Sequence, residues 1–270
     1  VILVIDEAHN LVERGRGYYS PELSAQTARA AAAAVGRGGE PVRRVAERLC
    51  LELAETIERA VSGALEEEAP GAVAIETPLP EEALWRLRPE FDAAFVDYLE
   101  HQRETKSMSA DDRFVALYFG LLRFLNVLLV ADAAFSRYVV AEGGDCKIRM
   151  LCKDPSRFLG AILSRTHATI GLSATLSPQE FYRDLLGFGA ERTTFLALPD
   201  PFPPAHRRVV VDTTVATTFR ERPANTPRIA ERLAAFTDAV PGNCLALFPS
   251  YQFLEAVASH LRPRNKRILI

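Results

Sequence analysis

Five consecutive apolar residues, Val1 to Ile5, run directly into the acids Asp6 and Glu7. A continuous run of β-branched residues and leucine is typical of a strand buried on both faces of a parallel sheet. A second strand is predicted over residues 168–172, which are followed by the sequence Ser-Ala-Thr. Ligands of open α/β sheets bind at the carboxyl ends of the strands, so both ends are candidate sites. We expect an α/β fold with both strands in one parallel sheet.

Most of the sequence between these two strands has helical periodicity. Apolar side chains recur at helical spacing in residues 28–35, 42–64 and 91–99. A longer apolar run, residues 114–134, follows Ser109, which is a candidate N-cap. Because Arg123 and Asp132 interrupt this run, we predict a helix buried in protein rather than a membrane span. The pattern predicts an all-helical insertion over residues 21–144.

Glycine- and proline-rich sequences mark the limits of these regions. Residues 70–80 predict a loop, and two short runs joined by Gly143-Gly144 predict a β-hairpin that leaves the insertion. The proline-rich residues 200–204 predict a stiff linker. The expected parts of the chain are a first domain of residues 1–20 and 145–198, the insertion of residues 21–144, and a second domain of residues 199–270.

Strands and helices are predicted to alternate after the insertion. In the first domain we expect a helix over residues 155–165 and another that Ser177-Pro178 opens. In the second domain we expect strands over residues 208–212, 244–248 and 267–270, and helices over residues 226–240 and 251–261. Alternation of this kind indicates a second parallel sheet.

The acids at the end of the first strand suit the hydrolysis of a metal-bound nucleotide. Asp6 can hold a magnesium ion that bridges the phosphates, often through water. Glu7 can orient or deprotonate the attacking water. Two adjacent acids are also common on idle, exposed strand ends. The complete sequence Asp-Glu-Ala-His after a buried strand favours the functional interpretation, and the Ser-Ala-Thr sequence after the second strand supports it.

These motifs resemble those of the XPD/DinG branch of superfamily 2 DNA helicases. The matching pieces, in the family's order, are residues 4–11, 172–178, 201–204, 219–222, 241–243 and 247–251. The resemblance implies RecA-like motor domains, with the helical segment in the place of the family's arch domain. It implies an enzyme that uses ATP and magnesium to move along single-stranded DNA in the 5′ to 3′ direction, in DNA repair or replication.

The resemblance also implies roles for individual residues. Asp6 would bind magnesium and Glu7 would be the catalytic base. The residues that couple hydrolysis to domain movement would be His9, Ser173 and Thr175. The candidate contacts to DNA are Ser250, Tyr251, Arg220 and Arg222. The basic residues Arg262, Arg264, Lys266 and Arg267 fit either a contact to nucleic acid or a solvated helix end.

The chain departs from the family's pattern in two respects. It contains no G-x-x-x-x-G-K-[ST] phosphate-binding loop, and its four cysteines are not at the positions of the family's iron–sulfur ligands. The family carries both features upstream of the Asp-Glu-Ala-His box. We therefore expect a fragment of a longer helicase that is inactive by itself, and an iron–sulfur cluster would have to be held by another part of the parent protein.

Two other functions remain open from the sequence. The first is a non-catalytic module, in which the helical insertion gates DNA or binds a protein partner. The second is an unrelated magnesium-dependent phosphohydrolase, for which Asp212 is the obvious additional acid. The formal net charge of −3 restricts any nucleic-acid contact to local basic patches. Five apolar residues are too few for a secretory signal, and the spacing of the cysteines favours reduced thiols, so we expect a cytoplasmic location.

Overall fold

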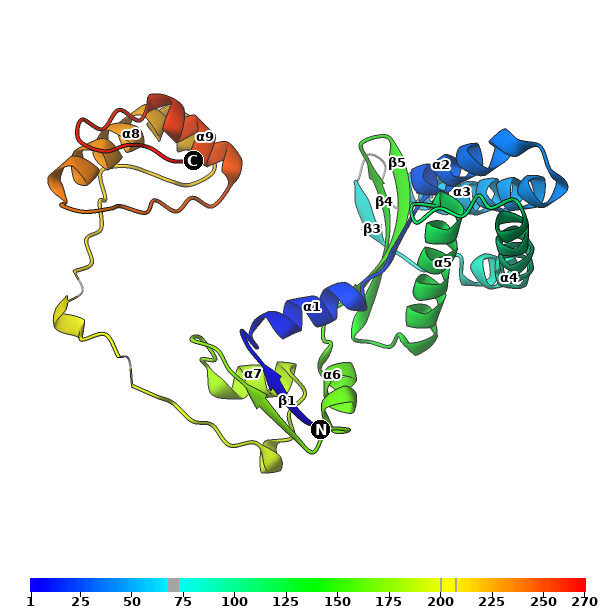
Figure 1. The fold of residues 1–270 in the computed structure, drawn as a ribbon, viewed down its shortest axis with the longest axis horizontal. Helices are drawn as coiled ribbons and strands as arrows, with labels where there is room; N and C mark the ends of the chain where they lie inside the picture. The colour runs from blue at the N-terminus through cyan, green and yellow to red at the C-terminus, as the bar shows by residue number, and fades with distance from the viewer. Residues whose placement is uncertain (68–72, 200, 207) are drawn as a thin grey trace. The chain divides into compact units, whose positions relative to one another are not determined.

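A computed structural model describes residues 1–67, 73–199, 201–206 and 208–270. The chain forms two compact units, residues 1–196 and 197–270 (Figure 1). We describe each unit by itself.

Two strands from opposite ends of the first unit form a parallel pair. Strand β1 (Ile2–Ile5) pairs with β6 (Ala168–Gly171), and the register places Ile2 opposite Ala168 and Ile5 opposite Gly171. This confirms the predicted pairing of the two strands. The expectation that β1 is buried on both faces is wrong, because Ile2 is 62% exposed and Val4 is 58% exposed. The described residues supply only these two strands to the sheet, so one apolar face has no cover.

Short helices accompany this strand pair. Helix α1 (Asn10–Tyr18) follows β1, and α6 (Ser156–Leu163) precedes β6. Helix α7 (Gln179–Leu185) follows β6 and begins just after Pro178. The helices predicted over residues 155–165 and after Ser177-Pro178 are thus confirmed.

The segment between the two strands contains four long helices and a sheet. The helices are α2 (Ala25–Val35), α3 (Pro41–Glu67), α4 (Glu81–Glu104) and α5 (Arg113–Val130). The antiparallel sheet has the order β2-β5-β4-β3, formed by β2 (Glu22–Ser24), β5 (Asp145–Cys152), β4 (Phe135–Glu142) and β3 (Ala74–Glu76). The prediction of an all-helical insertion is therefore wrong. Strands β2 and β3 are three residues long, which is too short for a visible alternation of apolar and polar residues.

The predicted hairpin is confirmed, but its place in the fold differs from the expectation. Strands β4 and β5 pair along their whole length, and Gly143 and Gly144 join them with φ angles of 60° and 79°. Two consecutive positive φ values are those of a type I′ turn, which glycine adopts without strain. Because β5 also pairs with β2, the hairpin is the centre of the antiparallel sheet. The expected domain boundary at residue 144 falls inside this turn. The predicted loop at 70–80 contains β3, and residues 70–72 lie outside the described part.

The main hydrophobic core lies between α2–α5 and the antiparallel sheet. Its largest fully buried side chains include Phe91, Phe114 and Phe124. Helix α5 is the one helix in the described residues that is long and apolar enough to cross a membrane, but eight of its residues are buried in this core. This confirms the prediction of a protein-buried helix. Its N-cap is Asp112 rather than Ser109, since the Asp112 carboxylate accepts hydrogen bonds from the N–H groups of the first helical turn.

The second unit contains two packed helices. Helices α8 (Arg222–Ala239) and α9 (Tyr251–His260) confirm the predicted helices. Its buried core consists of Ala230, Phe253 and Val257. The three predicted strands are wrong, because the described residues of this unit form no strand. These segments have the composition of strands but no hydrogen-bonded neighbour, and a strand requires one.

The remaining elements of the described residues, in both units, are single 3₁₀ turns at Gly36–Gly38, Ala190–Arg192 and Pro204–His206.

Candidate functional site

The turn between β1 and α1 presents two carboxylates to solvent. Asp6 and Glu7 are both exposed, and the Glu7 N–H donates a hydrogen bond to Asp6 Oδ1 at 2.9 Å. Glu7 has a φ of 49°, in the left-handed region that non-glycine residues seldom adopt. Such a conformation costs about 1–2 kcal/mol, and it persists only where the surroundings hold it. The turn is held by the Asn10 N–H, which donates to the Glu7 carbonyl.

Backbone hydrogen bonds join this turn to the end of β6. The Ala8 N–H donates to the Leu172 carbonyl at 2.9 Å, and the Leu172 N–H donates to the Ile5 carbonyl at 2.8 Å. Ala8 is buried, and a Cβ atom at Gly171 would lie 3.3 Å from the Ala8 Cβ. A larger residue at either position would press the two chain segments apart. The small residues therefore let the turn after β1 lie directly against the end of β6.

Side chains of the two motifs also meet. His9 Nδ1 lies 2.8 Å from Ser173 Oγ and 3.2 Å from Glu7 Oε2. Ser173 Oγ in turn accepts a hydrogen bond from the Thr175 N–H at 3.2 Å. The structure thus brings together Glu7, His9, Ser173 and Thr175. When Nδ1 carries a proton, it can donate either to the Glu7 carboxylate or to the Ser173 hydroxyl. His9 Nδ1 therefore has two alternative acceptors, one in each motif.

The carboxylates fit a magnesium ion that is held mainly by water and phosphate. Magnesium retains several waters and is bound by one or two carboxylates together with substrate phosphates. The exposed Asp6 carboxylate can take this role beside Glu7. The described residues contain no group of three or more His, Cys, Asp or Glu side chains that could hold a metal ion, so a magnesium ion here would need further ligands from water and phosphate.

The candidate DNA contacts belong to the second unit. Ser250 is the N-cap of α9, and its Oγ accepts a hydrogen bond from the Phe253 N–H at 3.2 Å. Tyr251 is 86% exposed and Arg220 is exposed. Arg222 is committed to local packing, since its Nε donates to the Thr217 carbonyl and its guanidinium lies 4.8 Å from the Phe253 ring centroid. Tyr251 and Arg220 are accessible to a ligand, whereas Arg222 and Ser250 hold the local fold.

The basic residues after α9 have structural contacts as well. The N–H groups of Arg264 and Asn265 donate to the Asp238 carboxylate, and the Lys266 ammonium donates to the Gly242 carbonyl. These hydrogen bonds hold the segment after α9 against the end of α8. They favour the solvated helix end over the nucleic-acid contact for Lys266.

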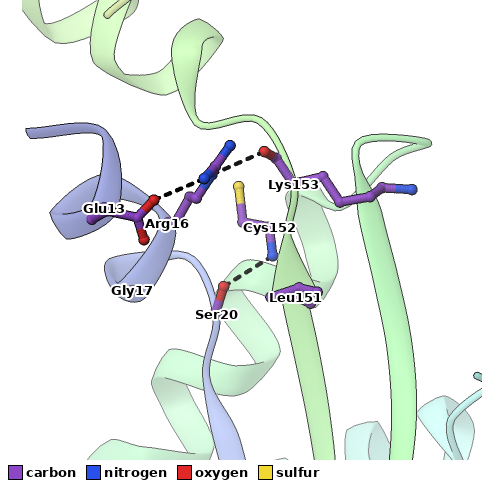
Figure 2. A pocket seen from close by; sticks show the side chains of 7 residues that line it. All are labelled: Glu13, Arg16, Gly17, Ser20, Leu151, Cys152 and Lys153. Atoms are coloured by element: carbon purple, nitrogen blue, oxygen red, sulfur yellow. Dashed lines mark hydrogen bonds and ion pairs between the residues drawn. The ribbon is translucent and has the colours of Figure 1, made fainter. Parts of the chain in front are cut away.

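An open depression of about 530 Å³ lies beside α1 (Figure 2). Arg16 crosses it, with Nη1 2.8 Å from Glu13 Oε1 and Nε donating to the Lys153 carbonyl at 3.1 Å. Burial raises the pKa of the Cys152 thiol at its edge, so this cysteine is a poor nucleophile. The lining residues of the depression join α1 to the end of β5 through the Arg16 and Ser20 hydrogen bonds. Nothing in the sequence predicted it, because its members come from separate segments without a motif.

The contribution of backbone groups to the site was also missed from the sequence. The N–H and carbonyl groups of Ala8 and Leu172 join the two motifs, and only their positions inside those motifs hinted at a role.

No protein-family model matches this chain. The resemblance to helicases therefore depends on the motifs and on their order along the chain.

Proposed function

We propose that this chain carries the hydrolysis and coupling motifs of an ATP-dependent DNA helicase similar to the XPD/DinG branch. The observation that carries the proposal is the contact between His9 and Ser173, which are 164 positions apart in the sequence. The Asp-Glu-Ala-His and Ser-Ala-Thr sequences follow the two strands of one parallel pair. Together they would carry out nucleotide hydrolysis. The backbone bonds between β1 and β6 are those of any parallel pair, whereas the His9–Ser173 contact joins side chains of the two motifs.

The proposed chemistry assigns separate tasks to the two acids. Bound magnesium would neutralise charge on the ATP phosphates, and Asp6 is the residue that would hold it. Glu7 accepts the proton of the attacking water as a general base. The left-handed backbone at Glu7 directs its side chain back toward His9, since Glu7 Oε2 lies 3.2 Å from His9 Nδ1. A change in the protonation or position of Glu7 is thereby felt at His9.

His9, Ser173 and Thr175 form the proposed coupling path from the nucleotide to the rest of the motor. Tyr251 and Arg220 are the proposed contacts to single-stranded DNA, because both side chains are exposed. By the same resemblance, the proposed enzyme moves in the 5′ to 3′ direction and acts in DNA repair or replication. Protein partners and a cluster in the parent protein are left open.

A second candidate function is a non-catalytic module that gates DNA or binds a partner. It is favoured by one observation, namely that the main hydrophobic core lies in the segment between β1 and β6 and not around the strand pair. A phosphate-binding loop encoded upstream of Val1 in the same gene would support the motor. A gene without such a loop would support the module.

Two matched variants test the proposed function in a protein that contains this chain together with a phosphate-binding loop. Glu7→Gln keeps the size of the side chain and removes the base, so ATP turnover should fall by about 10²–10⁴-fold while nucleotide binding persists. Asp6→Asn should instead weaken magnesium-dependent nucleotide binding. Steady-state ATP hydrolysis and nucleotide titrations distinguish the two defects. Near-normal turnover of the Glu7→Gln protein would remove the catalytic role.

The 270-residue chain by itself provides a control for these measurements. It lacks the sequence that grips the phosphates, and we expect no ATP hydrolysis above background. Robust DNA-stimulated hydrolysis by the isolated chain would contradict this expectation.

A further inference from the structure

Helix α1 runs directly from the motif turn to the insertion. His9 is its N-cap residue and Tyr18 its last residue, a span of about 13 Å for nine residues. Figure 1 shows α1 between the strand pair and the helices and sheet of the insertion. A helix this short is stiff along its axis. A displacement of one end therefore moves the other end as well.

The C-terminal end of α1 is held by an arginine from α5. Arg123 Nη2 donates to the carbonyls of Gly17 and Tyr18 at 2.7 and 2.8 Å, and its Nε donates to Tyr18 at 3.2 Å. The guanidinium also lies 5.4 Å from the Tyr18 ring centroid. A cation at this position complements the negative end of the helix and adds a donor to the last carbonyls, of which Gly17 also accepts from the Ser20 N–H.

The middle of α1 is held by close packing on α6. Gly15 is buried, and a Cβ atom there would lie 3.1 Å from the Pro155 Cβ and 3.4 Å from Leu159. Arg16 adds a hydrogen bond to the Lys153 carbonyl, shown in Figure 2. These contacts set the orientation of α1 between the motif turn and α5.

We propose that α1 is a mechanical link between the insertion and the motif turn, with Arg123 as the positioning residue that holds it. Displacement of α5 would pull on the end of α1 and alter the geometry at His9, and with it the contact to Ser173. The inference rests on the proposed function for its meaning in the motor, where the insertion would sense DNA and the turn would sense ATP. The mechanical link itself concerns only residues of this chain.

Hydrogen exchange of the 270-residue chain tests the link without nucleotide or DNA, so its outcome is separate from that of the ATPase measurements. The probes are the amides of Ala8 and Leu172, which form the backbone bonds between the two motifs. Arg123→Ala should speed their exchange about three- to tenfold, the range expected for the loss of an ordinary hydrogen bond, because Arg123 is exposed. Arg123→Lys should restore part of the protection, because an ammonium can still donate to a carbonyl.

Two controls separate a local link from general loosening. Arg29→Ala removes an exposed arginine of α2 whose partner is Glu58, and it should leave both amides unchanged. Amides inside α3 report opening of the whole insertion and should also be unchanged in Arg123→Ala. Gly15→Ala, which presses α1 away from α6, should speed the same two amides. Equal exchange of Ala8 and Leu172 in the Arg123→Ala and Arg29→Ala proteins would overturn the proposal, and so would a matching acceleration in α3.

Discussion

The insertion and the second unit both contain many apolar residues, but they differ greatly in how many of these side chains are buried. In the insertion, four helices pack on an antiparallel sheet and enclose large side chains such as Phe91 and Phe124. In the second unit, three residues form the hydrophobic core, and the apolar residues 209–211 lie outside any helix or strand and are exposed, with Val211 at 77%. The difference arises from strand pairing, because each strand of the insertion has a hydrogen-bonded neighbouring strand. An apolar run becomes a strand only where another strand satisfies its backbone.

Cysteine accessibility gives the largest expected contrast between the two regions. Burial raises the pKa of Cys50 in α3 to about 12 from the usual value of 9.0, which reduces its thiolate population about a thousandfold. Cys244 in the second unit is exposed. With a thiol reagent at pH 8, we expect a fast phase from Cys244 that is absent in Cys244→Ser. Labelling of Cys50 at a comparable rate would show that the insertion is open.

Truncation of a core side chain should affect the two regions unequally. Phe124→Ala removes a fully buried ring from α5 and should lower the free energy of unfolding of the insertion by about 3–5 kcal/mol. Val257→Ala, in the smaller core, removes two methyl groups and should cost about 1–2 kcal/mol in the second unit. The single tryptophan, Trp85 in α4, reports the insertion alone in denaturant titrations. A shift of the Trp85 transition in Val257→Ala would contradict the separation of the two units.

A helix cap provides a smaller test within the insertion. Asp112→Ala removes the acceptor for the first N–H groups of α5 and for the Tyr98 hydroxyl at 2.8 Å. We expect a loss of about 1–2 kcal/mol in the Trp85 transition. Ser109→Ala is the matched control and should change the stability by less than about 0.5 kcal/mol. A larger loss of stability in Ser109→Ala than in Asp112→Ala would show that Ser109 is the N-cap of α5.

Local patterns in the sequence predicted the helices and the hairpin of this chain well. The helical periodicity of residues 42–64 and the Gly143-Gly144 turn depend on neighbouring residues, and the structure confirms both. The sheet around the hairpin was not predictable, because β2 and β3 are defined only by their pairing with distant strands. The absent strands of the second unit show the same limit, since pairing cannot be determined from an apolar run alone.

The candidate site was largely predictable because its residues lie at strand ends. Parallel strands end at the same edge of a sheet, so the motifs after β1 and β6 were expected to meet, and His9 and Ser173 do so. The left-handed backbone of Glu7 and the close approach of Ala8 to Gly171 were not predictable, since both depend on the exact packing of the two turns. The environment of the DNA candidates depended on tertiary contacts, as Arg222 over Phe253 shows.

The proposed function requires that the two motif turns act as one unit in ATP hydrolysis. A double-mutant cycle tests it in a protein that contains this chain and a phosphate-binding loop, with ATP turnover measured for His9→Ala, Ser173→Ala and the double variant. Loss of their hydrogen bond should lower turnover about three- to tenfold in each single variant. We expect the double variant to be no slower than the slower single variant. Multiplication of the two single effects, or normal turnover in all three proteins, would contradict it.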